Sequence, residues 1–442
     1  MSLAVKHRRL PLACVILLGL ALAGGLLGAC RQGEPETPAG PTGTPPLTGQ
    51  PALPGPTSPP EGPAPQTQAL TLTLWTTEAF SPTQEVPQGQ ILAAQVASLP
   101  DLRLWFILKQ PYGEAGIQLY LLNTGAVVPS LLPDLAYVDV DEVDEIVRAG
   151  LAQPLDTLLS PNLVAGLYSF ARVACTFEGG LYCLPIEADL DHLVYNSFRL
   201  SRAPVSWTGV ISQSVPYVFP AGGEGGLVND AFLVQYQALR PTLDESASSA
   251  SFLDESSLVA VLQFYQDGAS QGLFPQAILQ YHTTDDSWQA YRSGLAAMAQ
   301  VSAHRYLAER GQAVFAMPAS IPSIGGPAAP TARGWALVLV TPDPARQVEA
   351  ARFMELWLSP ETNAGWNRAA GTLPTLKASL AYWDPADAYT AFLHQQLLAA
   401  HPRPTVPGYS QVAAALQEAV EAVLTGALTP EEAAADVMST AP

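Results

Sequence analysis

The stretch Leu184-Pro185-Ile186-Glu187-Ala188-Asp189-Leu190-Asp191-His192-Leu193-Val194-Tyr195-Asn196 decides the expected fold. It has a proline near its start, three carboxylates in its middle and a β-rich run at its end. Runs rich in β-branched and aromatic residues are typical of strands. We interpret the stretch as one strand that passes between two lobes of the protein.

A short hairpin is predicted directly before this strand. Cys175 and Cys183 flank the segment Thr176-Phe177-Glu178-Gly179-Gly180-Leu181-Tyr182, in which apolar residues lie on both sides of Glu-Gly-Gly. Two cysteines that face each other across such a hairpin can reach disulfide geometry, and an exported protein lies where disulfides persist. We therefore expect a Cys175–Cys183 disulfide. Free buried thiols or a two-thiolate metal site are the alternatives, although no further metal ligands follow at a usable spacing.

Strand and helix patterns alternate along the rest of the chain, which predicts an α/β sheet covered on both faces. The alternation begins at Leu70-Thr71-Leu72-Thr73-Leu74-Trp75, where apolar and polar residues follow the strand period. Further strands are expected at 102–108, 133–139, 294–301, 314–317 and 335–340, with a loop at 318–330. Helices are expected at 88–98, 114–124, 140–149, 228–240, 256–271, 285–293, 345–358 and 411–424.

The N-terminus has the pattern of an export signal. An apolar stretch from Leu10 to Leu27 follows basic residues and ends in small residues before Cys30. The run Leu26-Leu27-Gly28-Ala29-Cys30 resembles the lipobox of bacterial lipoproteins, in which the cysteine is lipidated and becomes the new N-terminus. Residues 1–29 are thus predicted to be a lipoprotein signal peptide and Cys30 the lipidation site. An ordinary signal peptide, or a membrane helix that contains a cysteine, is the alternative.

A linker and a strongly acidic head are predicted to follow the anchor. Residues 30–68 are dominated by Pro, Gly, Thr, Ser and Gln, so they cannot bury enough apolar surface to order themselves. The whole chain of 442 residues carries a net charge of −19, and removal of the three basic residues in 1–29 would leave −22. Such acidity argues against nucleic acid as a partner and against electrostatic docking on anionic lipid. The lipid on Cys30 would then be what holds the protein at the cell membrane surface.

The sequence carries no signature of a known enzyme class. The sequence contains no H-E-x-x-H, no G-x-S-x-G, no Walker loop and no Cys/His metal cluster, so no metal or cofactor is expected. Glu187, Asp189 and Asp191 could form a glycosidase pair, because carboxylates two residues apart on a strand share one face. The order of segments along the whole chain argues against an enzyme.

That order of segments resembles the extracellular solute-binding proteins of ABC importers, specifically the sugar-binding group that includes maltose-binding protein. The resemblance covers the chain after the linker. Its N-terminal part rests on the strand ending in Trp75, the Pro133-Asp134 strand, and Gly150 followed by Pro154-Leu155-Asp156. Its later part rests on the run from Pro185 to Tyr195-Asn196, Ser293-Gly294-Leu295-Ala296-Ala297-Met298, Gly334-Trp335, Gly371-Thr372-Leu373-Pro374-Thr375 and the C-terminal stretch from Leu424 to Ala434.

The resemblance implies a two-lobed periplasmic-binding-protein-like fold of type II, with a ligand cleft between lobes joined by hinge crossovers. The expected N-terminal lobe is 69–187 plus 318–370, and the C-terminal lobe is 188–317 plus 371–442. It also implies a monomer that captures a mono- or oligosaccharide outside the cytoplasm and delivers it to ABC permease subunits. A surface lipoprotein that acts as a sensor, or a binding module for a non-sugar solute, is the alternative.

The resemblance further implies ligand contacts at particular residues. Trp75, Thr77 and Glu78 end the first strand, where this family contacts ligand, although Trp75 could equally pack in a core. Asp139 and Asp141 resemble the family's acceptors for sugar hydroxyls, or they cap the next helix.

The remaining candidates lie at the crossovers and later in the chain. Glu187 and Asp189 are expected at the first crossover, where Asp189 best matches a cleft carboxylate and a solvated hinge is the alternative. Tyr306 lies where relatives carry an aromatic platform, and Trp335 is the aromatic residue we favour most. Trp366 is a weaker candidate, because a Trp on a helix is more often packed than exposed.

Overall fold

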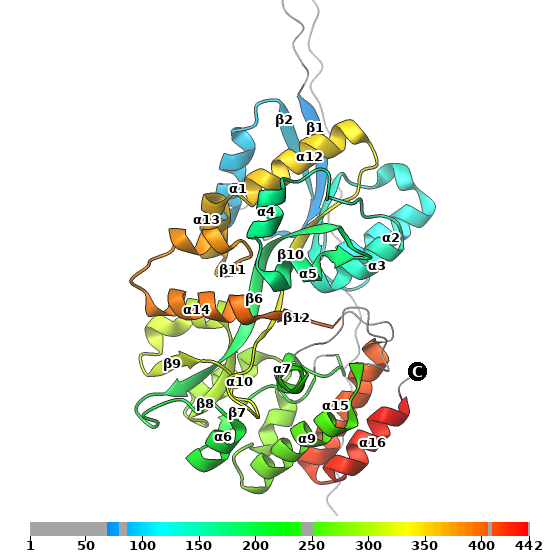
Figure 1. The fold of residues 1–442 in the computed structure, drawn as a ribbon. Coiled ribbons are helices and arrows are strands. Elements are labelled where there is room, and N and C mark those ends of the chain that lie inside the picture. The colour runs from blue at the N-terminus through cyan, green and yellow to red at the C-terminus, as the bar shows by residue number, and fades with distance from the viewer. Residues whose placement is uncertain (1–68, 79–85, 224, 241–251, 405–408, 441–442) are drawn as a thin grey trace, which may run out of the picture. The chain divides into compact units, whose positions relative to one another are not determined.

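The computed structural model describes residues 69–78, 86–223, 225–240, 252–404 and 409–440 (Figure 1). Residues 65–442 form one compact unit. The predicted signal peptide 1–29, the linker 30–68 and Cys30 lie outside the described residues. Within the described part of the chain, no helix has the length and apolar character needed to cross a membrane.

The first core is built from three strands and the helices between them. Strand β1 (Leu70–Thr76) pairs in parallel with β2 (Leu102–Leu108) and with β3 (Leu135–Asp139). The alternating apolar residues of β1 point into this core, where Leu72 and Leu74 are fully buried. The strands predicted here are confirmed. The helical elements between and after them are α1 (Pro87–Ala97), α2 (Ile117–Val127), η2 (Pro129–Leu131), η3 (Val140–Glu142) and α3 (Val143–Arg148).

The predicted disulfide hairpin is present at the edge of this core. Strands β4 (Thr176–Phe177) and β5 (Gly180–Leu181) are antiparallel, and the Cys175–Cys183 disulfide closes the hairpin. Both cysteines are buried in the first core. The disulfide therefore fixes the start of the strand that follows. Two short helices, α4 (Pro161–Gly166) and α5 (Ser169–Ala174), precede the hairpin.

Two long strands run side by side from the first core to the second, as Figure 1 shows. Strand β6 (Cys183–Asn196) pairs over its first half with β10 (Thr331–Leu339) and over its second half with β8 (Met298–Ser302) and β9 (Ala316–Ala319). Strand β10 also pairs with β3 on its other side. The stretch from Leu184 to Asn196 is thus a crossover strand, and β10 is the antiparallel return strand beside it.

The close contact between these two strands depends on one glycine. Gly334 lies opposite Ala188 in the register, and a Cβ atom at Gly334 would lie 2.0 Å from the carbonyl oxygen of Glu187. No side chain fits in that space. The register shifts by one residue between Trp335 and Ala336, opposite Pro185, as is common where a proline interrupts a ladder.

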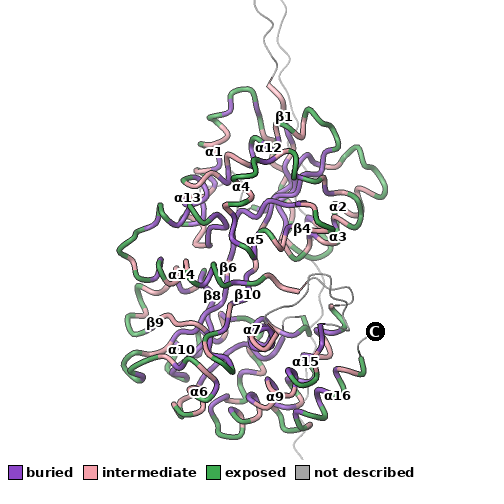
Figure 2. The backbone as a smooth tube through the Cα atoms, in the orientation of Figure 1, coloured by how far each residue is buried: buried purple, intermediate pink, exposed green. Residues whose placement is uncertain are grey.

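The second core surrounds the far halves of these strands. Its helices pack on both sides of β6 and β8, so that β6 is buried along most of its length (Figure 2). The elements of this part are α6 (Trp207–Gln213), β7 (Tyr217–Val218), α7 (Asp230–Leu239), α9 (Glu255–Ser270), η4 (Gln276–Gln280), α10 (Thr284–Arg292), α11 (Ala303–Glu309), η5 (Arg310–Gln312), η6 (Lys377–Tyr382), α14 (Ala388–Ala399), α15 (Tyr409–Thr425) and α16 (Pro430–Thr440).

The buried residues of the two cores indicate where the chain changes lobe. The first core uses most of the buried residues from Leu72 to Ile186, the segment from Ala336 to Leu358, and Trp366 and Leu376. Ala188 and Ala332 belong to the second core, as do the residues of α5, Phe170 and Ala171. The return crossing therefore lies near Ala336, and not at the expected residue 318. The reason is that β9, at 316–319, pairs with the second half of β6.

Two further helices and two short strands complete the fold. Helix α12 (Pro344–Trp357) packs on the first core, and α13 (Pro360–Ala370) follows it. Strand β11 (Leu373–Pro374) pairs with β6 at Glu187 and Ala188, and β12 (His401–Pro402) pairs in parallel with β10 at Thr331 and Ala332. Both short strands therefore join the crossover itself.

Candidate functional site

Two arginines lie next to each other at the crossover because of the strand pairing. In the parallel ladder, Ala332 is opposite Pro402, so that the next residues, Arg333 and Arg403, are neighbours. Asp230, at the first turn of α7, receives hydrogen bonds from both guanidinium groups. The Arg403 Nε–Oδ1 and Nη2–Oδ2 distances are 2.8 Å each, and the Arg333 Nη1–Oδ2 distance is 3.1 Å. One buried carboxylate thus separates two like charges.

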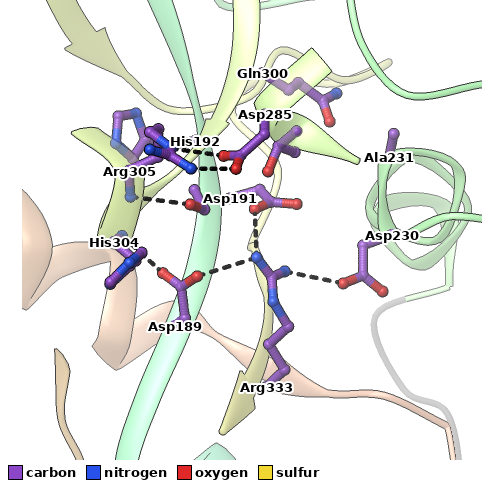
Figure 3. Close-up of polar contacts among 12 residues, drawn as sticks. Asp189, Asp191, His192, Asp230, Ala231, Asp285, Gln300, His304, Arg305 and Arg333 are labelled. Carbon is purple, nitrogen blue, oxygen red and sulfur yellow. Dashed lines mark hydrogen bonds and ion pairs between the residues drawn. The ribbon is translucent and has the colours of Figure 1, made fainter. Parts of the chain in front are cut away.

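Arg333 also reaches two carboxylates of the crossover strand (Figure 3). Its Nη2 lies 3.1 Å from Oδ2 of Asp189 and 2.9 Å from Oδ1 of Asp191. The other carboxylate oxygen of Asp189 accepts a hydrogen bond from the backbone N–H of His304, at the first turn of α11. The crossover is therefore charged, and its carboxylates are held by named donors.

Arg403 extends this set of ion pairs to the first core. Its Nη1 lies 2.6 Å from Oδ2 of Asp141, in η3, while its other nitrogens hold Asp230. Asp230 is almost fully buried, whereas about a third of each of the Arg403 and Asp141 side chains is exposed. Solvent therefore reaches the part of the network that faces the first core.

Burial and charge act in opposite directions on the buried carboxylates. Burial alone would raise the pKa of Asp230, but Arg403 and Arg333 outweigh it and hold that pKa below its usual value. For Asp191, burial outweighs the single neighbour Arg333, so its pKa is raised. Asp230 is thus the carboxylate whose negative charge the site stabilises most clearly.

Aromatic rings lie beside the acidic residues at the end of β3. Trp335 is directly opposite Asp139 in the β10–β3 ladder and opposite Glu187 in the β10–β6 ladder. Tyr112 donates a hydrogen bond of 2.7 Å from its hydroxyl to Oδ2 of Asp139. Its ring centroid lies 5.7 Å from that of Trp335, which also stacks on the ring of Tyr137. Trp335 is half-buried and Tyr112 is exposed, so these rings offer aromatic surface beside a carboxylate.

The acidic residues of this corner raise one another's pKa. Burial and then the neighbouring Asp141 raise the pKa of Asp139, even though Tyr112 and the backbone N–H of Asp141 donate to it. Burial, Asp139 and Asp141 raise the pKa of Glu142 to about 7. The Oδ1 atom of Asp139 also caps η3, which confirms the capping role considered for this residue.

Glu187 is a buried carboxylate at the centre of the crossover. Its Oε2 accepts a hydrogen bond from Nε1 of Trp366 at 3.2 Å and lies 3.4 Å from the hydroxyl of Thr372. Burial raises its pKa to about 7 against these donors. The side chain is 6% exposed, so Glu187 holds α13 and the segment before β11 on the crossover strand instead of pointing into solvent.

Burial argues against ligand contact for several of the predicted residues. Trp366 is fully buried in the first core, as expected for a Trp on a helix. Tyr306 is buried in the second core, where its hydroxyl donates to the carbonyl of Ala316. Trp75 and Thr77 are also buried, and Trp75 packs edge-on against Tyr120.

The predicted residues with accessible surface fall into two places. Glu78 is exposed at the end of β1, directly before the undescribed residues 79–85. Asp139, Asp141, Asp189 and Trp335 lie together at the crossover and carry partly exposed side chains. The structure therefore brings four of the ten candidates to one place with solvent access.

Four residues of this site were not predicted from the sequence. Arg333 directly precedes Gly334-Trp335, and this adjacency is the only available signal for it. Asp230, Arg403 and Tyr112 lie at a helix start and in two loops, and nothing local distinguishes them from surface residues. The β10–β12 pairing, which joins residues about seventy positions apart, places Arg403 beside Arg333, and the β10–β3 pairing brings Trp335 and Asp139, the two contacts of Tyr112, together.

A separate pocket lies in the second lobe. It has a volume of about 170 Å³ and is bordered by α10 and α11. Its ionic side chains already pair with one another, as in the Arg292–Glu309 and Arg305–Asp285 ion pairs. Among the described residues, no group of three or more His, Cys, Asp or Glu side chains is arranged to hold a metal ion. The pocket is lined by Asp285, Trp288, Gln289, Arg292, Arg305 and Glu309.

Two cores joined by paired crossover strands, with polar and aromatic side chains gathered at the crossing, define a two-lobed α/β binding protein. The chain belongs to the family of bacterial extracellular solute-binding proteins, whose sequence profile matches residues 110–394. Membership implies an exported protein that binds a solute, and not an enzyme.

Solved structures of sugar-binding proteins share this fold. The cyclic alpha-maltosyl-1,6-maltose binding protein of Arthrobacter globiformis superposes with a TM-score of 0.69 at 18% identity, covering 84% of this chain and 98% of that one. The maltose-binding periplasmic protein of Listeria monocytogenes, in complex with maltose, gives 0.67 at 15% identity, covering 84% and 96%. The Thermus thermophilus maltotriose binding protein, bound with maltotriose, gives 0.61 at 17% identity, covering 84% and 98%. The fold is therefore that of maltose-binding proteins, the two-lobed type II fold expected from the sequence.

A curated relative matches over a shorter length. The maltotriose-binding protein of Pyrococcus abyssi (strain GE5 / Orsay) is 26% identical over 95 residues, which are 22% of this chain and 21% of the relative. The chain thus matches about a fifth of that protein's length.

Proposed function

We propose that this protein captures a carbohydrate, a mono- or oligosaccharide, between its two lobes at the crossover strands. The observation that carries the proposal is the corner formed by Tyr112, Asp139 and Trp335, in which aromatic surface lies beside a hydrogen-bonded carboxylate. A pyranose offers C–H groups that pack on an aromatic face and hydroxyls that donate to carboxylates. The similar proteins named above that bind maltose or maltotriose support the same class of ligand.

In this proposal the accessible candidates have distinct roles. Trp335 and Tyr112 supply the aromatic faces, and Asp139 and Asp141 accept hydrogen bonds from sugar hydroxyls. Asp189, on the crossover strand, accepts from the part of the ligand that faces the second lobe. A ligand held from both sides stabilises the closed state through contacts that neither lobe makes alone.

A binding experiment tests this role. Residues 65–442, the compact unit with both cores, are titrated with glucose, maltose, maltotriose and maltotetraose, and the heat of binding is measured by calorimetry. The melting temperature Tm is then measured with and without each sugar. At least one sugar should raise Tm, because a ligand that binds only the native state stabilises it. Trp335→Ala should weaken that binding about tenfold or more. Trp105→Ala, at an exposed Trp of β2, is the matched control and should leave affinity unchanged.

Two results would overturn the sugar assignment or the site. If no sugar of a broad panel shifts Tm or gives heat, the ligand is not a carbohydrate. If Trp335→Ala and Trp105→Ala bind alike, the aromatic corner is not the site. Trp335→Phe, which keeps a ring on Tyr137, distinguishes lost ligand contact from lost packing.

We further propose that the protein works as a monomer, anchored by lipid on Cys30 and tethered by residues 30–68, and delivers its ligand to an ABC permease. A tether that keeps a binding protein near its permease raises their effective concentration. Cys30→Ala should release the protein from the membrane fraction into the medium or periplasm, and deletion of the permease genes should abolish uptake of the sugar. A Cys30→Ala protein that stays in the membrane fraction after its signal peptide has been removed would exclude the lipid anchor.

A further inference from the structure

A continuous chain of ion pairs connects the two lobes. It runs from Asp189 and Asp191 on β6 through Arg333 to Asp230, and from there through Arg403 to Asp141. Figure 3 shows its first part, from Asp189 and Asp191 to Asp230. Each step is a direct nitrogen–oxygen contact of 3.1 Å or less.

Among these ion pairs, only Arg403–Asp141 includes a residue of the first lobe that is not on the crossover strands. Asp141 lies in η3 of the first lobe, whereas Arg403 follows β12 and precedes α15, which pack on the second. The other ion pairs among the described residues join side chains within one lobe or on the crossover strands themselves. In the described part of the chain, Arg403–Asp141 is therefore the ion pair that spans the lobes.

The two ends of Arg403 are held with unequal strength. Toward Asp230 it makes two hydrogen bonds to a buried carboxylate, a bidentate geometry that fixes the guanidinium. Toward Asp141 it makes one hydrogen bond at a place where both side chains are about one-third exposed. If the lobes separate, we expect the single, more exposed contact to Asp141 to break and the bidentate contact to Asp230 to stay.

We propose that Arg403 is an interlobe clasp, a positioning residue whose bond to Asp141 favours the closed arrangement of the lobes before any ligand binds. Asp230 holds the guanidinium of Arg403 in place, and Asp141 is the partner in the first lobe to which Arg403 binds. Because the Arg403–Asp141 ion pair is partly exposed, its attraction is modest and sensitive to salt. The inference concerns the ligand-free protein and holds whichever solute the protein captures.

A distance measurement on the ligand-free protein tests the clasp. Spin labels are placed on residues 65–442 at Asp101→Cys in the first lobe and Arg202→Cys in the second, both exposed and polar, and pulsed electron resonance measures their separation. Arg403→Gln should lower the ratio of short-distance to long-distance populations about two- to fivefold. Salt at about 1 M should produce the same shift in the parent protein and little further shift in Arg403→Gln.

Two additional variants keep the test decisive. Asp141→Asn leaves Arg403 on Asp230 and should give the same shift toward longer distances as Arg403→Gln. Arg310→Gln breaks the Arg310–Asp387 ion pair, which has similar exposure but lies within the second lobe, and should leave the distances unchanged.

The proposal is overturned if Arg403→Gln and Asp141→Asn keep the parent's distance distribution, or if Arg310→Gln moves it equally. Thermal unfolding of each variant shows that it is folded before the distances are compared. The distance measurement uses no sugar, so its result does not depend on whether the ligand is a carbohydrate. In the same way, the sugar titration can be interpreted even if the Arg403–Asp141 ion pair has no effect on the lobes.

Discussion

The contact between the crossover strands makes a strong prediction for Gly334→Ala. The new Cβ would lie 2.0 Å from the carbonyl oxygen of Glu187 and 2.9 Å from Cα of Ala188. Carbon atoms pack favourably at about 3.5 Å or more, so β6 and β10 must move apart by roughly an ångström or more. The atoms in the way are backbone atoms, and no side chain can rotate to relieve the clash.

The cost follows from what the movement disrupts. Overpacking costs about 1–3 kcal/mol, and each ladder hydrogen bond that is lost adds about 1 kcal/mol. We therefore expect Gly334→Ala to lower the free energy of unfolding of residues 65–442 by about 2–5 kcal/mol.

Urea unfolding followed by circular dichroism measures this change. Gly325→Ala is the control, because a Cβ at Gly325 meets nothing within 4 Å, and its effect should stay within about 0.5 kcal/mol. If Gly334→Ala unfolds at the same urea concentration as the parent, the backbones of β6 and β10 do not approach each other closely at Gly334, which would contradict the prediction.

Three further predictions concern the charges and the disulfide. Asp230→Asn removes the negative charge between Arg333 and Arg403 and should lower the free energy of unfolding by about 2–4 kcal/mol. Asp141→Asn, at a partly exposed ion pair, should lower it by less than about 1 kcal/mol. Equal effects of the two variants in urea unfolding would contradict the central place of Asp230. Since the pKa of Glu187 is raised from 4.5 to about 7 on folding, the folded state holds the proton more tightly, and the contribution of Glu187 to stability falls as pH rises from about 4.5 to about 7. Glu187→Gln should therefore match the parent near pH 4 and gain up to about 3 kcal/mol relative to it at pH 8, and a pH-independent difference would contradict this assignment. Reduction of the buried Cys175–Cys183 disulfide, verified by intact mass, frees a short loop and should cost about 2–3 kcal/mol; an unchanged Tm of the reduced protein would show that the hairpin holds without the disulfide.

Much of the fold could be predicted from local sequence patterns, because these patterns follow from burial. The alternation in Leu70–Trp75 and the apolar run at 102–108 indicate strands whose faces are buried, and both are strands in the structure. The stretch from Leu184 to Asn196 was predicted as a crossover from its acidic centre, and Asp189 and Asp191 do lie at the crossing. The predicted hairpin is confirmed: Gly179 supplies one of the two positive φ angles of the tight turn, and Glu178 adopts the other, which a non-glycine residue rarely does.

The site was less predictable, because tertiary pairing decides it. The sequence favours Trp335 over Trp366, because a Trp on a helix is more often packed, but it does not show that the indole N–H of the buried Trp366 donates to Glu187. Arg403 and Asp230 escaped prediction for the same reason. Each is an ordinary polar residue locally, and only the β10–β12 ladder and the start of α7 bring them together.

The most direct test of the account is a crystal structure of residues 65–442 with the tightest-binding sugar of the panel. We predict a sugar ring against Trp335 and Tyr112, with a hydroxyl donating to Asp139 or Asp141 and both lobes in contact with the ligand. A sugar bound instead in the pocket beside Trp288 and Arg292, or one that touches none of Tyr112, Asp139 and Trp335, would contradict it.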